Sequence, residues 1–85
     1  MYVVVEIQDG EVTMHSKGYD TLQDVVNAFY NDAAEERNHE TGDLELADIM
    51  ESQAFDVEVG VIGKDDWGTI EIETGPGKIV KIHKM

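Results

Sequence analysis

Alternating hydrophobic and polar residues open the chain, and this period of two predicts a β-hairpin over residues 2–17. Asp9-Gly10 supplies the turn signal, because a two-residue type I′ turn needs a positive φ at both central positions. The turn sets a register in which Ile7 lies opposite Val12, and directly opposed residues share a face of the sheet. The predicted inner, apolar face consists of Val3, Val5, Ile7, Val12, Met14 and Ser16. The predicted outer face consists of Tyr2, Val4, Glu6, Thr13, His15 and Lys17.

An amphipathic helix is predicted over residues 21–36. Asp20 or Thr21 is its expected N-cap, and Gln23 or Asp24 is the capping-box partner. The apolar residues recur at intervals of three and four, which places them on one side of a helix. This stripe comprises Leu22, Val25, Val26, Phe29, Tyr30 and Ala33.

A polar segment over residues 37–42 ends in glycine and predicts a loop. Asp43 then favours a second, shorter helix over residues 44–52 by capping its first turn. The alternation of Leu44 and Leu46 also permits a strand to begin here, so both alternatives stay open.

The last third of the chain predicts three antiparallel strands. Apolar residues alternate with polar ones over residues 55–62 and again around Ile70 and Ile72. A turn at residues 75–77, Gly-Pro-Gly, leads into the last strand. The predicted pairs are Val61 with Ile70, Val59 with Ile72, Ile72 with Val80, Ile70 with Ile82 and Glu71 with Lys81.

These elements predict a single α+β domain over residues 1–85. Their order is β-β-α-(α)-β-β-β, and every inferred strand contact is antiparallel and local. We therefore expect two layers, with one amphipathic helix packed on one face of a sheet of about five strands.

The negative charge of the chain is concentrated in its central segment. The chain carries 19 carboxylates and 6 lysines or arginines, and twelve of the carboxylates lie between Asp20 and Glu58 with Arg37 as the one base among them. This charge argues against direct contact with nucleic acid or anionic lipid, both of which need a basic surface. Basic protein surfaces or cations are therefore the expected partners.

Several functional classes lack their sequence signals. Ser16 and Ser52 have no G-x-S-x-G context, and the glycines before Lys78 lack the following helix of a phosphate-binding loop. We therefore expect no enzyme activity and no cofactor. The chain has no cysteine, no basic leader at its start and no apolar run of membrane-spanning length, which together favour a cytoplasmic protein.

Metal binding is an alternative with little support. Asp65-Asp66 lacks the oxygen spacing of a calcium loop. His15, His39 and His83 are not spaced as a zinc ligand set, so solvent-exposed histidines are expected.

The acidic segment permits three interpretations: a solvated helix face, adaptation to salt, or a binding face for a basic surface. Salt adaptation would suppress lysine, but five of the six basic residues are lysines. Acids near the C-terminus of a helix oppose its dipole, so stability does not account for them. We therefore favour a partner-binding face. Its candidate residues are Asp24, Asp32, Glu35, Glu36, Glu40, Asp43, Glu45, Asp48 and Glu51.

In size, charge and organisation the chain resembles small phage proteins that act as DNA mimics or anti-CRISPR inhibitors. This resemblance involves no motif and transfers no functional residue. It implies a non-enzymatic inhibitor that occludes a basic, nucleic-acid-binding surface of a partner protein. One alternative is a structural or self-associating module that uses an outer sheet face with Tyr2, Val4, Ile62 and Ile79. A small metal-binding domain is the other.

Overall fold

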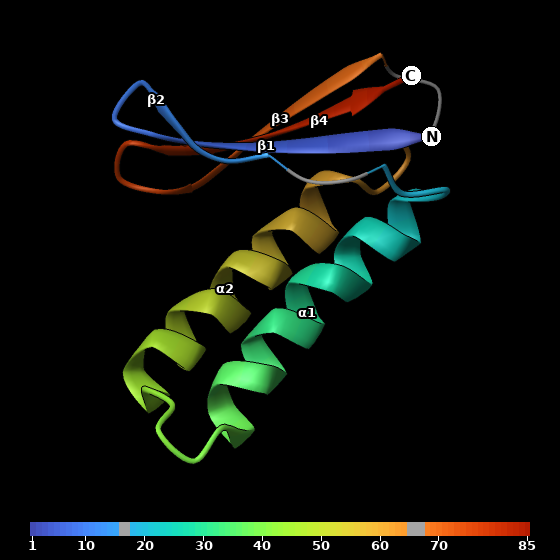
Figure 1. Ribbon diagram of the computed structural model, residues 1–85. Helices are drawn as coiled ribbons and strands as arrows, with labels where there is room; N and C mark the ends of the chain where they lie inside the picture. Colours follow the sequence, from blue (N-terminus) through green and yellow to red (C-terminus); the bar gives the residue numbers. More distant parts are fainter. Residues whose placement is uncertain (16–17, 65–67) are drawn as a thin grey trace.

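The computed structural model describes residues 1–15, 18–64 and 68–85, which form one antiparallel sheet and two helices (Figure 1). The elements are β1 (Tyr2–Gln8), β2 (Glu11–His15), α1 (Leu22–Asn38), α2 (Leu44–Gly60), β3 (Thr69–Gly75) and β4 (Lys78–Lys84). The sheet order is β2-β1-β4-β3, so the strand pair at the start of the chain joins the pair at its end through β1 and β4. The predicted α+β class is confirmed, but the sheet has four strands rather than about five, and it is accompanied by two helices rather than one.

Both predicted turns join neighbouring strands. Asp9 and Gly10 have φ values of 52° and 87°, as the turn between β1 and β2 requires. The register of β3 and β4 is also confirmed, because Ile70 lies opposite Ile82 and Glu71 opposite Lys81. The Glu71 and Lys81 side chains form an ion pair at 3.1 Å.

The predicted inner face of β1 is wrong. Ile7 pairs with Val12 as expected, but an irregularity follows, and Glu6 then lies opposite Met14. The buried face of β1 carries Tyr2 and Val4, whereas the odd-numbered residues from Val3 onwards face away from the helices. The run from Tyr2 to Ile7 is apolar at nearly every position, so its pattern does not say which side is buried. Ser16 and Lys17 lie outside the described residues.

The predicted strand over residues 55–62 is also wrong, because α2 continues to Gly60. The segment satisfies two periods at once. Its alternation favoured a strand, yet Ala47, Ala54 and Val57 recur at helical intervals and are all buried. Asp43 starts the helix by accepting hydrogen bonds from the amides of Glu45 and Leu46. The predicted pairs of Val59 and Val61 with β3 therefore do not form.

The helix predicted over residues 21–36 is confirmed as α1. Thr21 is its N-cap, and the hydroxyl accepts from the Asp24 amide at 3.0 Å. Leu22, Val25 and Val26 are buried, as the apolar stripe predicts.

The two helices run side by side and project from one face of the sheet (Figure 1). The core joins the sheet to the first turns of α1 and the last turns of α2, with Val25 and Val57 fully buried there. Farther from the sheet, Ala33 and Ala47 are buried but lie outside this core. The loop between the helices lies far from the sheet (Figure 1). We call residues 22–60 the helical hairpin.

Candidate functional site

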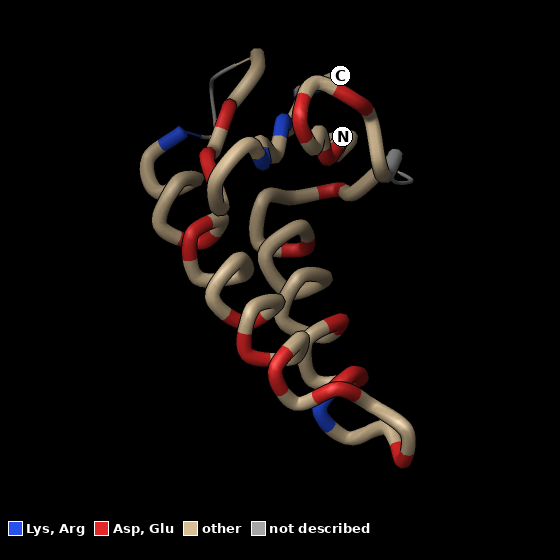
Figure 2. Tube along the Cα trace, turned by 90° about the vertical axis from the view of Figure 1, so that its left-hand side faces the viewer, with Lys and Arg blue, Asp and Glu red and all other residues tan. Residues whose placement is uncertain are grey.

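The helical hairpin concentrates the charge of the protein. It contains eleven carboxylates and one arginine, a net charge of −10. Figure 2 shows acidic positions along both helices and their connecting loop, while the described lysines lie toward the sheet. The structure thus gathers eight of the nine predicted binding residues on α1 or α2 or at the N-cap of α2, with Glu40 in the loop.

Two of these carboxylates shape the tip of the hairpin. The Glu36 side chain accepts a hydrogen bond from the Asp43 amide at 3.0 Å, and the Asp43 carboxylate caps α2. A Cβ atom at Gly42 would overlap the carbonyl oxygen of Glu36, so this loop requires glycine. Glu36 and Asp43 therefore have structural roles.

Two more carboxylates bind the single arginine. The Arg37 Nη2 atom lies 2.5 Å from Asp48 Oδ1 and 2.9 Å from Glu51 Oε2, which links the end of α1 to α2. Hydrogen bonds to Asp48 and Glu51 raise the pKa of Arg37, so the guanidinium is firmly charged. The pair of bridges still leaves one negative charge in excess.

Eight of the nine predicted binding residues are exposed, and Glu36 is half-buried. Five of the exposed residues take no part in the contacts just described: Asp24, Asp32, Glu35, Glu40 and Glu45. Within the described part of the chain, the side chains of Glu35, Glu40 and Glu45 form no hydrogen bond and no ion pair. Partial desolvation, followed by the charges of Glu35 and Glu6, raises the pKa of Asp32 although its side chain is largely exposed. A raised carboxyl pKa means that the folded protein opposes this negative charge.

The sequence analysis missed the exposed apolar side chains of α2. Its interpretation of residues 55–62 as a strand placed alternate residues in the core. In the structure Phe55 and Val59 are 57% and 51% exposed, and Ile62, just beyond the helix, is 71% exposed. Ile49 is exposed on another side of α2. The apolar residues around the whole helix were the available signal, since a helix buried on one side needs only one apolar stripe.

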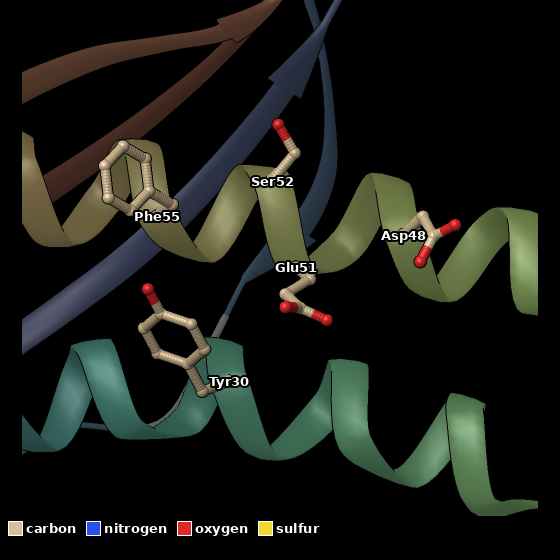
Figure 3. A pocket seen from close by; sticks show the side chains of 5 residues that line it. All are labelled: Tyr30, Asp48, Glu51, Ser52 and Phe55. Carbon is tan, nitrogen blue, oxygen red and sulfur yellow. The ribbon is translucent and has the colours of Figure 1, made fainter.

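A pocket of about 350 Å³ lies beside Phe55, between the two helices (Figure 3). Tyr30 enters it from α1, and α2 supplies the other labelled side chains: Asp48, Glu51, Ser52 and Phe55. The Tyr30 hydroxyl donates to Glu58 Oε1 at 3.0 Å. Partial desolvation, this hydrogen bond and the charges of Glu58 and Glu51 raise the pKa of Tyr30, so its hydroxyl stays a donor.

A second missed cluster connects the helical hairpin to the sheet. Gln53 of α2 is buried, and its Nε2 donates to Glu6 Oε1 of β1 at 2.7 Å. Lys78 Nζ lies 3.2 Å from both Glu6 Oε1 and Gln53 Oε1. These three residues line a smaller pocket of about 170 Å³ together with Asp32. The sequence analysis missed the network because it placed Glu6 on the outer face of the sheet.

The four residues of the predicted outer-face interface do not share a surface. Tyr2 and Val4 belong to the core, and Ile62 lies at the end of the helical hairpin. Only Ile79 lies on the uncovered face of the sheet, where it pairs with Ile7. The prediction of that particular interface is therefore wrong.

The metal candidates do not come together in the described residues. No group of three or more potential ligands is found in residues 1–15, 18–64 and 68–85. His39 Nδ1 lies 2.9 Å from the Thr41 hydroxyl, and His83 Nδ1 lies 3.3 Å from that of Thr69. Asp65 and Asp66 lie outside the described residues. Over the same part of the chain, no helix is long and apolar enough to cross a membrane.

Comparison of the chain with protein-family models, with curated proteins and with solved structures finds no match.

Proposed function

We propose that this chain is a non-enzymatic binding protein whose helical hairpin occludes a basic surface of a partner protein. The observation that carries the proposal is the combination, on one projecting hairpin, of a net charge of −10 and several exposed large apolar side chains. The partner surface is one that normally binds nucleic acid, because such surfaces have clustered arginines and lysines.

Part of the charge supports this proposal because it does not stabilise the fold. Glu35 lies in the last turn of α1, where its carboxylate opposes the helix dipole by about 0.3–1 kcal/mol before screening. Glu40, in the loop that follows, adds the same sign and has no ion pair within the described residues. Their arrangement matches a cationic partner, whose arginines would form charge-assisted hydrogen bonds to them.

The apolar side chains support a protein partner. Interfaces between proteins combine a buried apolar centre with a polar rim. Phe55 and Val59 alternate on α2 with carboxylates such as Asp56 and Glu58, which supplies both components.

The mechanism is electrostatic attraction followed by steric exclusion. The local negative field speeds encounter with a basic surface, most strongly at low salt. The docked hairpin then covers the positions that a nucleic-acid backbone would contact. No bond is made or broken.

Affinity capture with charge-matched variants tests the proposal. One variant carries Glu35→Gln, Glu40→Gln and Glu45→Gln on the helical hairpin, and its control carries Glu11→Gln, Glu71→Gln and Glu73→Gln on the sheet. Both remove three exposed negative charges. We expect the parent and the control to retain a basic protein that free DNA displaces, and the hairpin variant to lose most of it. Equal retention by all three proteins would refute the proposal.

The uncovered sheet face favours a second candidate function, self-association. Val12, Ile7 and Ile79 lie side by side across three strands on the face that no helix covers. The strands are nearly neutral, so charge does not oppose a second copy at this face as it does at the hairpin. Sedimentation at high protein concentration tests this, and a monomer at all concentrations excludes it. A dimer that Ile79→Lys dissolves supports it.

A further inference from the structure

Two pockets adjoin along one side of the helical hairpin. The first is the pocket at Tyr30 and Phe55 (Figure 3). The second, about 450 Å³, lies nearer the sheet and is lined by Leu22 and Val26 of α1 and by residues 58 and 61–63. Glu58 lines the second pocket and accepts a hydrogen bond from Tyr30 of the first, so the two pockets lie next to each other. We call them together the interhelical groove.

Helical spacing places the residues that line the two pockets in two rows, one on each helix. Leu22, Val26 and Tyr30 follow one another at intervals of four along α1. On α2, Glu51, Phe55, Glu58 and Ile62 follow at intervals of three and four. The groove extends from Asp48 to Ile62, or about 20 Å at the rise of an α-helix.

The surface of the groove combines two chemistries. Phe55 and Ile62, which line the two pockets, are each more than half exposed, and so is Val59 on the same stretch of the chain. Asp48, Glu51 and Glu58 supply carboxylates along the same length. A small domain rarely exposes so many large apolar side chains together unless they bind something.

We propose that the interhelical groove binds a basic amphipathic helix of the partner protein. This inference rests on the proposed function and specifies the part of the partner that is recognised. An incoming helix presents apolar residues at intervals of three and four, which match the intervals of Phe55, Val59 and Ile62. Arginines and lysines on either side of its apolar stripe then meet Glu51 and Glu58.

Charge selects this occupant over others. A second copy of the chain would bring two hairpins of charge −10 together, and a nucleic acid or an anionic membrane would be repelled in the same way. An extended peptide gains its main-chain hydrogen bonds at a strand edge, whereas the walls of this groove are helices. A cationic helix satisfies both the shape and the charge.

The test uses two synthetic peptides of about 18 residues, long enough to span the groove. Both contain the same leucines, lysines and arginines. One places the leucines on a single helical face, and the other distributes them around the helix. We expect calorimetry to show binding of the amphipathic peptide about tenfold tighter or more. NMR shifts should concentrate at Tyr30, Phe55 and Ile62.

Variants locate the binding surface. Phe55→Ser and Ile62→Ser should each weaken the amphipathic peptide about tenfold, with little effect on the other peptide. Ile49→Ser is the matched control, because Ile49 is equally exposed on α2 but lies about 120° around the helix from Phe55. It should change the affinity less than about twofold. The NMR spectrum of each variant verifies folding, and the shift map of the parent protein is independent of any substitution.

The outcomes separate this inference from the proposed function. Suppose that both peptides bind equally, that Phe55→Ser does not change their affinity, and that neutralising Glu35, Glu40 and Glu45 weakens the binding of both. The proposal that the groove binds a helix is then refuted, while the proposed function of the acidic surface is retained. If neutralisation also has no effect, both proposals fail. A dimer of the protein alone that Phe55→Ser dissolves would assign the groove to a second copy.

Discussion

The four strands carry four carboxylates and three lysines, whereas the helical hairpin carries eleven carboxylates and one arginine. Strand β3 also separates its residues cleanly: Ile70 and Ile72 are buried while Glu71 and Glu73 are exposed. The helix α2 does not, since it leaves Ile49, Phe55 and Val59 in solvent. Strand β3 thus follows the requirements of stability, and the helical hairpin departs from them in its charge and in its exposed apolar residues.

The largest effect should come from placing the same charge in both regions. Ile70 is 2% exposed and Ile49 is 63% exposed. Ile70→Asp puts an unpaired charge in the core and should destabilise the fold by about 4 kcal/mol or more, enough to unfold it. Ile49→Asp should change stability by about 0.5 kcal/mol at most. Circular dichroism and thermal melting measure the stability of both variants. Similar melting curves would contradict the assignment of Ile70 to the core and of Ile49 to the surface.

A smaller effect is expected where the two regions meet. Gln53→Ala removes the hydrogen bonds to Glu6 and Lys78 and leaves their polar groups without these partners. We expect the free energy of unfolding to fall by about 1–3 kcal/mol. Gln23→Ala is the matched control, because the exposed Gln23 side chain donates its hydrogen bond to Asn27 one turn along the same helix. It should cost about 0.5 kcal/mol or less. Equal losses in urea denaturation would show that the network does not hold the hairpin on the sheet.

Asp43 separates the effect of capping from that of charge. Asp43→Ala removes the N-cap of α2 and should cost about 1 kcal/mol. Asp43→Asn keeps a capping oxygen while removing the charge, and should change stability by a few tenths of a kcal/mol, roughly. Chemical denaturation of the two variants decides this, and an equal loss would mean that the negative charge, rather than the cap, stabilises α2.

The smallest effect differs in sign between the regions. Glu71→Gln breaks the exposed pair with Lys81 and should lower stability by about 0.2–1 kcal/mol. Glu35→Gln relieves repulsion and an unfavourable dipole contact, and should raise stability by about 0.3–1 kcal/mol at low salt. Denaturation at two salt concentrations measures both changes. A loss of stability in Glu35→Gln would show that the hairpin charge supports the fold.

The sequence predicted local features whose determinants are close together in the chain. The Asp9-Gly10 turn, the Thr21 cap and the pairing of β3 with β4 each depend on a few neighbouring residues. The buried face of β1 could not be predicted in this way, because Val3, Val4 and Val5 are apolar on both sides.

The second helix shows a different limit. Over residues 55–61 apolar residues satisfy a strand period and a helical period together. The continuation of the helix from Asp43 and the burial of Ala54 and Val57 decide between them, and burial depends on tertiary packing. The acidic site residues were predicted from charge alone. The exposed apolar residues of the candidate site were missed, because the incorrect strand prediction placed Phe55 and Val59 in the core.

Site-specific photo-crosslinking tests the central claim most directly, because it reports where a partner lies. A photoreactive residue replaces Ser52 on the helical hairpin in one protein and Glu73 on the sheet in another, both exposed positions. We predict that a basic protein crosslinks at position 52 at low salt, that high salt or free DNA suppresses the product, and that position 73 gives none. Crosslinking of that protein at position 73 and not at position 52 would contradict the account.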